Sequence, residues 1–279
     1  MTTTVWLNGW LGPAEEARVS ALDHGLTVGD GVFETIKVTD GRPFALTRHL
    51  LRLARSAATL GLPSPGEVLL RKAVDEVIGA AALKGMGRLR LTVTGGAGPL
   101  GTDRGDAPPT VVAAFTAAQP WPADVAVVRV PWTRNERSSV AGAKTTSYAE
   151  NVAALQAAHQ QGASEALFGN GRGELCEGTG SNVFIVLGDE VLTPTLASGC
   201  LAGITRELLL EWAAKNGLPV FERDVPLAAL DDAEAALLTS STRDVQPVGV
   251  LDGRVLPGSP LVEATVELFA RYAAEHDDP

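Results

Sequence analysis

The sequence predicts an α+β protein with two domains, because strand-like and helix-like segments occur in both halves of the chain. With 279 residues, of which 45% are hydrophobic, the chain can bury the core of one large or two modest domains. The proline-rich stretch Pro120-Trp121-Pro122 reads as a connector between the halves. We therefore expect a small α/β domain over residues 1-118, a connector over 119-123 and a larger α/β domain over 124-279.

Two hairpin signals stand near the start of the chain. A strand over 3-7 ends at Asn8-Gly9, and a strand over 32-39, rich in β-branched residues, ends at Asp40-Gly41. Both dipeptides are typical of tight two-residue turns, so each strand is expected to fold back on itself.

The rest of the first half predicts two helices, two strands and an irregular loop. The loop over 95-109 holds too much glycine and proline for regular structure. The other expected elements are a helix that Thr47 caps and Gly61 ends, a helix over 65-83, and strands over 88-94 and 110-115.

The second half alternates in the same way. Its clearest element is a helix over 204-216, whose apolar residues recur at helical spacing and which Asn216-Gly217 ends. The other expected elements are a strand over 125-130, a helix over 148-161, and strands over 165-168, 182-187 and 190-192.

Composition excludes several classes of function. The 33 acidic and 23 basic residues give a formal charge of -10, whereas proteins that bind nucleic acid carry a basic surface. No apolar run is long enough to span a bilayer, and the start of the chain does not resemble a secretion signal. Cys176 and Cys200, with four histidines, make neither a disulfide framework nor a metal cluster. We expect a cytoplasmic protein with no metal, no nucleic-acid partner and no membrane partner.

The common catalytic motifs are absent from the sequence, and an unusual lysine remains. There is no GxSxG, no Walker loop, no HExxH and no GxGxxG that opens a helix. Lys144 follows the small residues 140-143 and precedes the hydroxyl residues 145-147. Such neighbours favour a desolvated amine that can form a Schiff base, and a lysine exposed at a strand end is the alternative.

A glycine-rich turn over 176-182 places Glu177 just before a buried strand at 183-186. A carboxylate there can keep a pyridinium nitrogen protonated, as a pyridoxal phosphate enzyme requires. A surface acid in a turn is the alternative.

Two further segments suit an anion. Residues 198-205 lead into a helix N-terminus, where free N–H groups and the helix dipole favour negative charge. Ordinary capping by Ser198 or Thr205 is the alternative there. Residues 239-242 are four consecutive hydroxyl residues, which can donate to phosphate oxygens or simply form a turn.

Taken in order, these segments resemble the fold-type IV pyridoxal phosphate enzymes, the class IV aminotransferase family. The matching segments cover nearly the whole chain: 29-34 (GDGVFE), 49-53 (HLLRL), 177-193 and the helix start Gly203-Ile204-Thr205-Arg206. The resemblance implies a two-domain, D-amino acid aminotransferase-like fold with a small N-terminal and a larger C-terminal α/β domain. It also implies pyridoxal 5'-phosphate as the cofactor and a homodimer that binds a small-molecule substrate.

The resemblance further implies roles for individual residues. Lys144 corresponds to the lysine that holds the cofactor covalently and then moves protons, and Glu177 to the acid at the pyridine nitrogen. Arg52 corresponds to the arginine at the cofactor phosphate, whereas helical spacing alone places it in a solvated stripe with Arg48 and Arg55. The remaining implied cofactor contacts are Leu201 on a ring face, Tyr148 near the ring hydroxyl, and Gly203, Ile204, Thr205, Ser240 and Ser241 at the phosphate.

The family contains aminotransferases and a lyase. Its D-amino acid aminotransferases hold the substrate carboxylate with an Arg-x-His pair in a loop that here has neither residue at that place, with Arg104 as the nearest substitute. The run 141-151 is most similar to the lyases that release 4-aminobenzoate. We therefore expect a 4-amino-4-deoxychorismate lyase, in which Thr35 helps to protonate the leaving group or is only a structural strand residue.

Two competing hypotheses remain open at the level of sequence. One is an aminotransferase of the same family that acts on D-amino acids, branched-chain amino acids or R-amines. The other is a protein that keeps this fold without catalysis and binds a small acid.

Overall fold

The computed structural model describes residues 2–279 and divides them into two compact units. Unit 1 holds the residues up to Pro120 together with the segment Ala143–Ser147 and Asp278. Unit 2 holds Trp121–Gly142, Tyr148–Asp277 and Pro279. The segment around Lys144 therefore packs with unit 1, although its sequence position falls within the expected domain 124-279.

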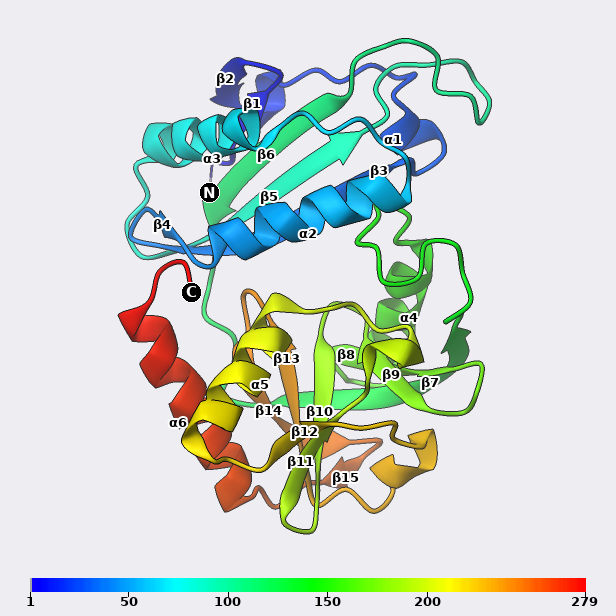
Figure 1. Ribbon diagram of the computed structural model, residues 1–279, viewed down its shortest axis with the longest axis vertical. Helices are drawn as coiled ribbons and strands as arrows, with labels where there is room; N and C mark the ends of the chain where they lie inside the picture. The colour runs from blue at the N-terminus through cyan, green and yellow to red at the C-terminus, as the bar shows by residue number, and fades with distance from the viewer. Residues whose placement is uncertain (1) are drawn as a thin grey trace. The chain divides into compact units, whose positions relative to one another are not determined.

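Unit 1 is built on an antiparallel sheet of strand order β2-β1-β6-β5-β3-β4. Its strands are β1 (Thr4–Leu7), β2 (Trp10–Pro13), β3 (Gly31–Thr39), β4 (Arg42–Pro43), β5 (Met86–Thr94) and β6 (Thr110–Ala117). Its helices are α1 (His24–Thr27), α2 (Leu46–Thr59), α3 (Glu67–Ala81) and the 3₁₀ turn Ala14–Glu16. Figure 1 shows α2 and α3 lying on the same face of this sheet.

Both predicted hairpins are confirmed. Asn8 and Gly9 have φ of 47° and 95°, and Asp40 and Gly41 have φ of 49° and 81°. Positive φ at both central residues is the type I′ geometry, whose twist matches that of the paired strands. These turns join β1 to β2 and β3 to β4.

The predicted cap of α2 is wrong. The helix begins at Leu46 after Ala45, which takes a left-handed φ of 54°, so Thr47 lies inside the first turn. The carboxylate of Asp278 accepts hydrogen bonds from the Thr47 N–H (2.8 Å) and the Thr47 hydroxyl (2.5 Å). A residue 231 positions away thus supplies the cap that the local sequence lacks.

The core of unit 1 lies between the sheet and its two long helices. Alternate residues of β3, such as Val32, Ile36 and Val38, point into it and are fully buried. The loop over 95-109 contains no helix or strand, as the sequence predicts.

Unit 2 contains a mixed sheet of strand order β12-β11-β10-β13-β14-β7-β8-β9, with β15 paired to β14. Its strands are β7 (Val125–Arg134), β8 (Glu165–Asn170), β9 (Leu175–Gly178), β10 (Asn182–Leu187), β11 (Glu190–Thr193), β12 (Val220–Glu222), β13 (Ala235–Ser240), β14 (Asp244–Leu251) and β15 (Arg254–Val255). The pairs β11–β12, β14–β7 and β7–β8 are parallel.

Three helices pack on the sheet of unit 2 within the described residues: α4 (Ala149–Gln160), α5 (Ile204–Asn216) and α6 (Pro260–Glu275). Two 3₁₀ turns, Leu196–Ser198 and Leu227–Leu230, complete its helical content. α5 begins and ends where the sequence predicts, and Gly217 closes it with a φ of 68°.

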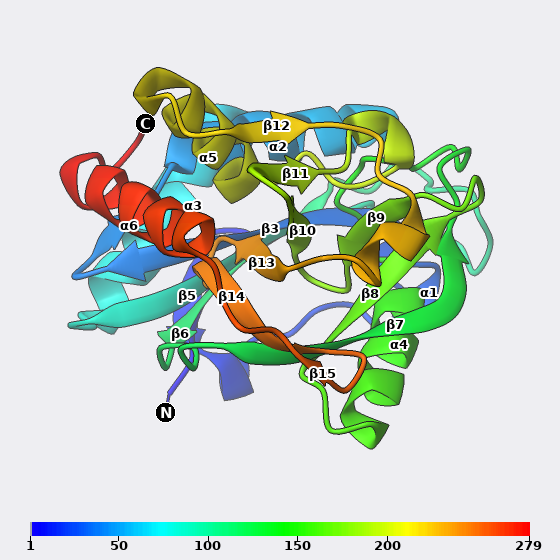
Figure 2. The ribbon, with the colours of Figure 1, turned by 90° about the horizontal axis from the view of Figure 1, so that it is seen from below.

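Sequence analysis missed α6, which lies along β13 and β14 (Figure 2). Ser259 caps it by accepting from the Leu261 N–H (3.2 Å), and Pro260 occupies its first position. Phe269 packs on Trp212 of α5, with ring centroids 5.1 Å apart. A Ser-Pro start followed by apolar residues at helical spacing was therefore the overlooked signal.

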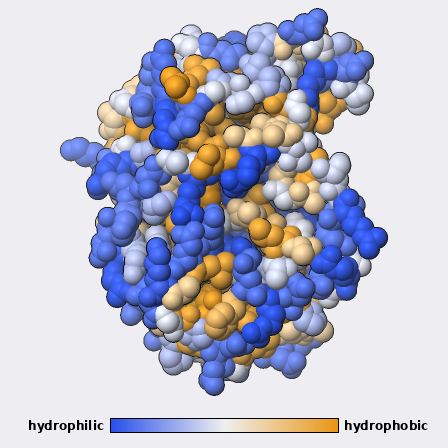
Figure 3. Space-filling model, in the orientation of Figure 1, coloured by the Kyte–Doolittle hydropathy of each residue, from blue (hydrophilic) through white to orange (hydrophobic). Residues whose placement is uncertain are grey.

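Every helix within residues 2–279 is too short or too polar to cross a membrane. On the face that Figure 3 shows, hydrophobic residues form small patches separated by hydrophilic ones.

Candidate active site

The backbone of Lys144 runs beside the start of β3. Its carbonyl oxygen accepts from the Phe33 N–H (3.0 Å), and the next residues continue the pairing through Thr146 N–H to Gly31 O (2.8 Å). The Lys144 N–H donates to the hydroxyl of Ser56, a buried residue of α2 (3.0 Å). Hydrogen bonds to β3 and α2 therefore fix the lysine within unit 1.

Glycines at the start of β3 make room for this segment. A Cβ on Gly31 would lie 3.0 Å from both the Thr146 hydroxyl and the Val93 carbonyl oxygen, and Gly29 has a φ of 68° with Ser147 against it. The sequence 29-31 (GDG) thus lets the lysine segment approach the sheet closely.

The side chain of Lys144 lies over an aromatic ring of β3. Its Nζ is 4.5 Å from the centroid of the Phe33 ring, and the residue is half-buried. Thr35 follows Phe33 by two residues, so both side chains lie on the same face of the sheet. The structure therefore brings the predicted Lys144 and Thr35 to one face.

Arg52 lies on the other face of β3, in a buried group of charges. Its Nε and Nη2 donate to the two carboxylate oxygens of Glu34 (2.8 and 2.6 Å), and His49 Nδ1 is 2.6 Å from the same carboxylate. The Arg52 side chain is only 5% exposed, so the solvated-stripe interpretation is wrong for this residue. A bidentate ion pair fixes the direction of its guanidinium.

The side chains of this group shift the pKa of the Glu34 carboxyl and of the His49 imidazole. Burial alone would raise the pKa of Glu34, but Arg52 and His49 outweigh it and lower the value to about 2. Burial lowers the pKa of His49, and Glu34 only partly opposes that effect. The group is therefore an ionised carboxylate held by a guanidinium.

Arg104 is bound to the glycine motif. Its Nε and Nη2 donate to the carboxylate of Asp30 (2.5 and 2.6 Å), and its other donors reach the carbonyl oxygens of Leu60 and Gly61. The hydrogen bonds with Asp30 and the charge of its carboxylate raise the pKa of Arg104, while burial opposes the shift. The guanidinium holds the 95-108 loop in place, which disfavours its use as a grip for a substrate carboxylate.

In unit 2, Glu177 lies between a backbone donor and an arginine. Its Oε2 accepts from the Leu201 N–H (2.9 Å), and its Oε1 is 3.3 Å from Nε of Arg134, an ion pair without hydrogen-bond geometry. Arg134 also stacks on the Phe168 ring (4.4 Å) and donates to Asn151 (3.3 Å). The Glu177 side chain is 14% exposed, and its carboxylate forms an ion pair with Arg134.

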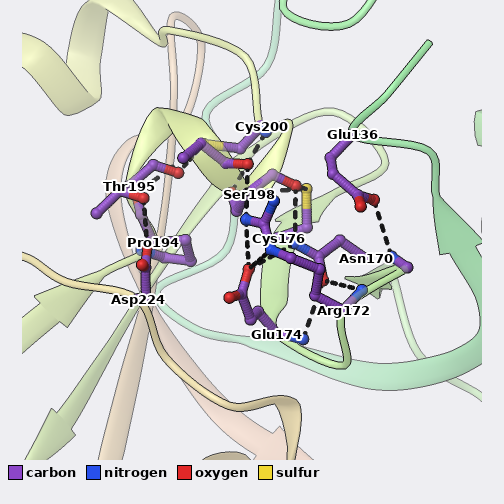
Figure 4. A network of polar contacts seen from close by, with 12 residues as sticks. Glu136, Asn170, Arg172, Glu174, Cys176, Pro194, Thr195, Ser198, Cys200 and Asp224 are labelled. Atoms are coloured by element: carbon purple, nitrogen blue, oxygen red, sulfur yellow. Dashed lines mark hydrogen bonds and ion pairs between the residues drawn. The ribbon is translucent and has the colours of Figure 1, made fainter.

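A polar network holds the segment that leads to Leu201 (Figure 4). Ser198 O accepts from Asn170 Nδ2 (3.1 Å) and from the Cys176 thiol (3.4 Å), and Thr195 bonds the carboxylate of Asp224. Burial raises the pKa of both the Cys176 and the Cys200 thiols, so they pack as neutral groups.

The start of α5 fits an anion. Gly203 precedes the helix, and no side chain within residues 2–279 caps it. A Cβ on Gly203 would lie 1.8 Å from Oδ1 of Asn182, whose amide donates to Leu201 O (2.8 Å). Thr239 pairs directly with Asn182, so its side chain shares that face, and its buried hydroxyl has no hydrogen-bond partner in the described chain. A phosphate bound here would accept hydrogen bonds from the free N–H groups at the start of α5 and from the unsatisfied hydroxyl of Thr239.

The other predicted contacts also lie in unit 2. Thr205 is buried in the first turn of α5, and Ser240 and Ser241 are half-buried where β13 ends. Tyr148 occupies the position just before α4 and is half-buried. The predicted site residues thus divide between the units: Thr35, Arg52 and Lys144 in unit 1, and Tyr148, Glu177, Leu201, Gly203, Ile204, Thr205, Ser240 and Ser241 in unit 2.

Sequence analysis missed the supporting residues. Glu34 and His49 lie inside matched motifs, and an acid within a β-branched strand was the available signal. Asn182 and Thr239 lie inside segments that the sequence singled out, 177-193 and 239-242, but their individual contacts depend on the pairing of β10 with β13. Arg134 carries no local signal, because its role comes from a contact with a distant segment.

Comparisons of the sequence and of the structure with known proteins find relatives of one family. The amino-transferase class IV family model matches residues 31–250. A putative branched-chain-amino-acid aminotransferase of Methanocaldococcus jannaschii is 32% identical, with 96% of this chain and 94% of that protein covered. A bifunctional aminodeoxychorismate lyase / D-amino acid transaminase of Mycobacterium tuberculosis is 35% identical, covering 86% and 88%. A hypothetical aminotransferase from Mycobacterium tuberculosis, solved in a PLP-bound form, has a TM-score of 0.86, 30% identity and 98% and 99% coverage.

Proposed function

The chain belongs to the amino-transferase class IV family, and on that premise we propose that it is a 4-amino-4-deoxychorismate lyase, which splits its substrate into 4-aminobenzoate and pyruvate. The protein is an enzyme of fold-type IV, and its cofactor is pyridoxal 5'-phosphate. When bound, this cofactor takes up the electron pair that a substrate carbon keeps as it loses its proton.

We assign roles to the chain's residues within that proposal. Lys144 holds the cofactor covalently and, once released, moves the proton of the reacting carbon. Glu177 keeps a proton on the pyridine nitrogen, and Arg134 lies beside Glu177 as its counter-ion at 3.3 Å. The phosphate is held by Arg52, Gly203, Ile204, Thr205, Ser240 and Ser241, while Leu201 packs on the ring and Tyr148 donates to its hydroxyl.

One observation carries the choice of a lyase. Thr35 lies on the same sheet face as Phe33, over whose ring the Lys144 amine sits at 4.5 Å. A lyase needs a base for the ring proton and a donor for the departing enolpyruvyl oxygen. Lys144 and Thr35 supply these two groups, and formation of an aromatic ring favours the elimination.

The test is the release of 4-aminobenzoate and pyruvate from 4-amino-4-deoxychorismate by the holoenzyme. We expect Thr35→Val to lower the rate by roughly 100-fold or more, because a positioned proton donor contributes about that much. Thr35→Ser should keep most of the rate. Thr39→Val is the matched control, since Thr39 lies on the same strand face at its exposed end. Full activity of Thr35→Val would remove the assignment.

An aminotransferase is the second candidate. Relatives at 32% and 35% identity carry transaminase names, and the lysine and acid would serve that reaction equally well. A holoenzyme that forms no 4-aminobenzoate, but whose absorbance changes with D-alanine or L-leucine, would establish this candidate instead. In either case we propose a homodimer, and a cytoplasmic location stays a prediction from sequence.

A further inference from the structure

Part of the proposed phosphate site lies in a three-residue loop of unit 2. Residues 241–243 join β13 to β14, whose facing ends, Ser240 and Asp244, are paired. Two of the proposed phosphate contacts, Ser240 and Ser241, therefore lie at one end of this loop, and Arg243 lies at the other. A hairpin loop this short leaves Ser241 little freedom once Arg243 is held in place.

Side chains from distant segments hold Arg243. Its own side chain is 6% exposed, and Oε2 of Glu165 lies 3.5 Å from its Nη2. The guanidinium stacks on Trp121, 3.7 Å from the ring centroid, and its Nη1 donates to Oε1 of Gln246 (2.6 Å). Trp121 also donates from Nε1 to the hydroxyl of Thr242 (3.3 Å). The loop is thus fixed through two of its three residues.

Glu165 is itself held by the turn 179–181. It begins β8, and its side chain is 2% exposed. Its Oε1 accepts from the N–H (2.9 Å) and from the hydroxyl of Thr179, and its Oε2 accepts from the hydroxyl of Ser181 (3.0 Å). Removing the charge of Glu165 would leave the buried guanidinium of Arg243 without this counter-ion, which is costly in the interior of a protein.

The ring end of the proposed cofactor site is held in another way. Glu177 lies in β9 opposite Phe168 of β8, so the pairing of these strands fixes its backbone. A disturbed loop 241–243 should therefore change the contacts to the phosphate and leave the acid at the ring in place.

We propose that Glu165 is a positioning residue that fixes the loop 241–243 through Arg243, and so sets how strongly the enzyme prefers pyridoxal 5'-phosphate to pyridoxal. The proposal rests on the phosphate contacts proposed above for Ser240 and Ser241. It holds for a lyase and for an aminotransferase alike, because both use the same cofactor.

The test is equilibrium dialysis of the chain, freed of its cofactor, with pyridoxal 5'-phosphate and with pyridoxal, which lacks the phosphate. The measured quantity is the ratio of the two dissociation constants. We expect Glu165→Gln to lower the preference for the phosphorylated form roughly 10-fold or more, the loss typical of a hydrogen bond to a charged group. Pyridoxal binding should be unchanged, whereas a general folding defect would weaken both ligands.

Trp121→Ala disturbs the loop from its other side. Trp121 is half-buried, so its truncation should leave the fold intact while it removes the ring under Arg243 and the hydrogen bond to Thr242. We expect the preference for the phosphorylated form to fall about fivefold, as the loss of a stacked cation implies.

Glu174→Gln is the matched control. Glu174 also binds an arginine, Arg172, and it contacts Asn170 at the opposite end of β8 from Glu165. Its preference should equal that of the wild type. An unchanged ratio in both Glu165→Gln and Trp121→Ala, equal weakening of both ligands by Glu165→Gln, or a loss of preference in Glu174→Gln would each overturn the proposal.

Failure of this proposal and failure of the proposed function give different results. A wild-type enzyme that releases no 4-aminobenzoate, while Glu165→Gln loses the preference, refutes the lyase and supports the positioning role. Normal release of 4-aminobenzoate with an unaltered preference in Glu165→Gln and in Trp121→Ala refutes the positioning role alone. A wild type that binds both ligands equally would overturn the phosphate contacts and the positioning role together.

Discussion

At the scale of single residues, Glu34 holds two buried basic side chains of unit 1, Arg52 and His49, in place. Its carboxylate bonds Arg52 twice and His49 once, and all three side chains are at most 5% exposed. A buried carboxylate of this kind stabilises the fold only while both partners remain, because either partner alone would be an uncompensated buried charge. Glu34 is thus a positioning residue that holds the Arg52 guanidinium in one direction.

The first prediction concerns this carboxylate. In the folded chain the pKa of Glu34 is lowered from 4.5 to about 2, so as the pH falls the unfolded chain takes up the proton first. The ionised Glu34 carboxylate contributes its full stabilisation of the fold above pH 4.5, and this contribution is lost as the pH falls through about 2. Glu34→Gln should abolish this part of the acid dependence and cost about 3–5 kcal/mol at neutral pH.

Urea unfolding of wild type and Glu34→Gln across the acidic range measures both effects. Glu67→Gln is the control, because Glu67 forms only an exposed pair with Arg71 and should change stability by less than about 1 kcal/mol. Equal stability of Glu34→Gln and Glu67→Gln would show that the buried group contributes nothing.

At the scale of elements, local patterns were sufficient for much of the fold. The two type I′ turns and the helix α5 were predicted at their observed positions, since each depends on residues adjacent in sequence. The start of α2 was predicted wrongly, because its cap is Asp278, at the far end of the chain. The packing of Lys144 on β3 was equally invisible, since it depends on pairing across more than 100 positions.

The residues of the candidate site also divide into those that adjacent sequence predicts and those that depend on distant segments. Lys144, Glu177 and the start of α5 could be proposed from motifs, whereas Arg134 could not. Arg134 lies beside Glu177 and over the Phe168 ring because β7 pairs with β8, in which Phe168 lies opposite Glu177 of β9. Register follows from the whole sheet and its turns, so no short segment encodes it.

The second prediction tests the start of α5. Gly203 has an ordinary φ of -69°, so its requirement is steric: an added Cβ would lie 1.8 Å from Asn182 Oδ1. Gly203→Ala should displace Asn182 and the first turn of the helix, costing about 1–3 kcal/mol and weakening cofactor binding roughly tenfold or more.

Melting temperature and equilibrium dialysis of the cofactor measure these losses. Gly180→Ala is the matched control, since nothing lies within 4 Å of its added Cβ and its φ is not left-handed. A Gly203→Ala protein that binds the cofactor like the wild type would contradict a phosphate site at this helix start.

At the scale of the whole molecule, exposed apolar residues cluster in one stretch of unit 1. Leu22, Leu26 and Val28 are 47%, 71% and 46% exposed. Trp10 and Val19, which precede them in the sequence, line an open pocket on the surface. A chain of formal charge -10 tolerates isolated exposed apolar residues, but several within residues 10–28 favour burial against a partner. A second copy of the chain would satisfy them by a symmetric contact.

The third prediction follows from that stretch. We expect light scattering to give twice the 29.0 kDa of the chain for the wild type. Leu26→Glu should shift the protein toward the monomer, because a charge would be buried in the contact without a partner. Val68→Glu, at a residue of α3 that is 86% exposed and far from this stretch in sequence, should leave the mass unchanged. A monomeric wild type with full activity would contradict the homodimer, whereas a dimeric Leu26→Glu would move the contact away from residues 10–28.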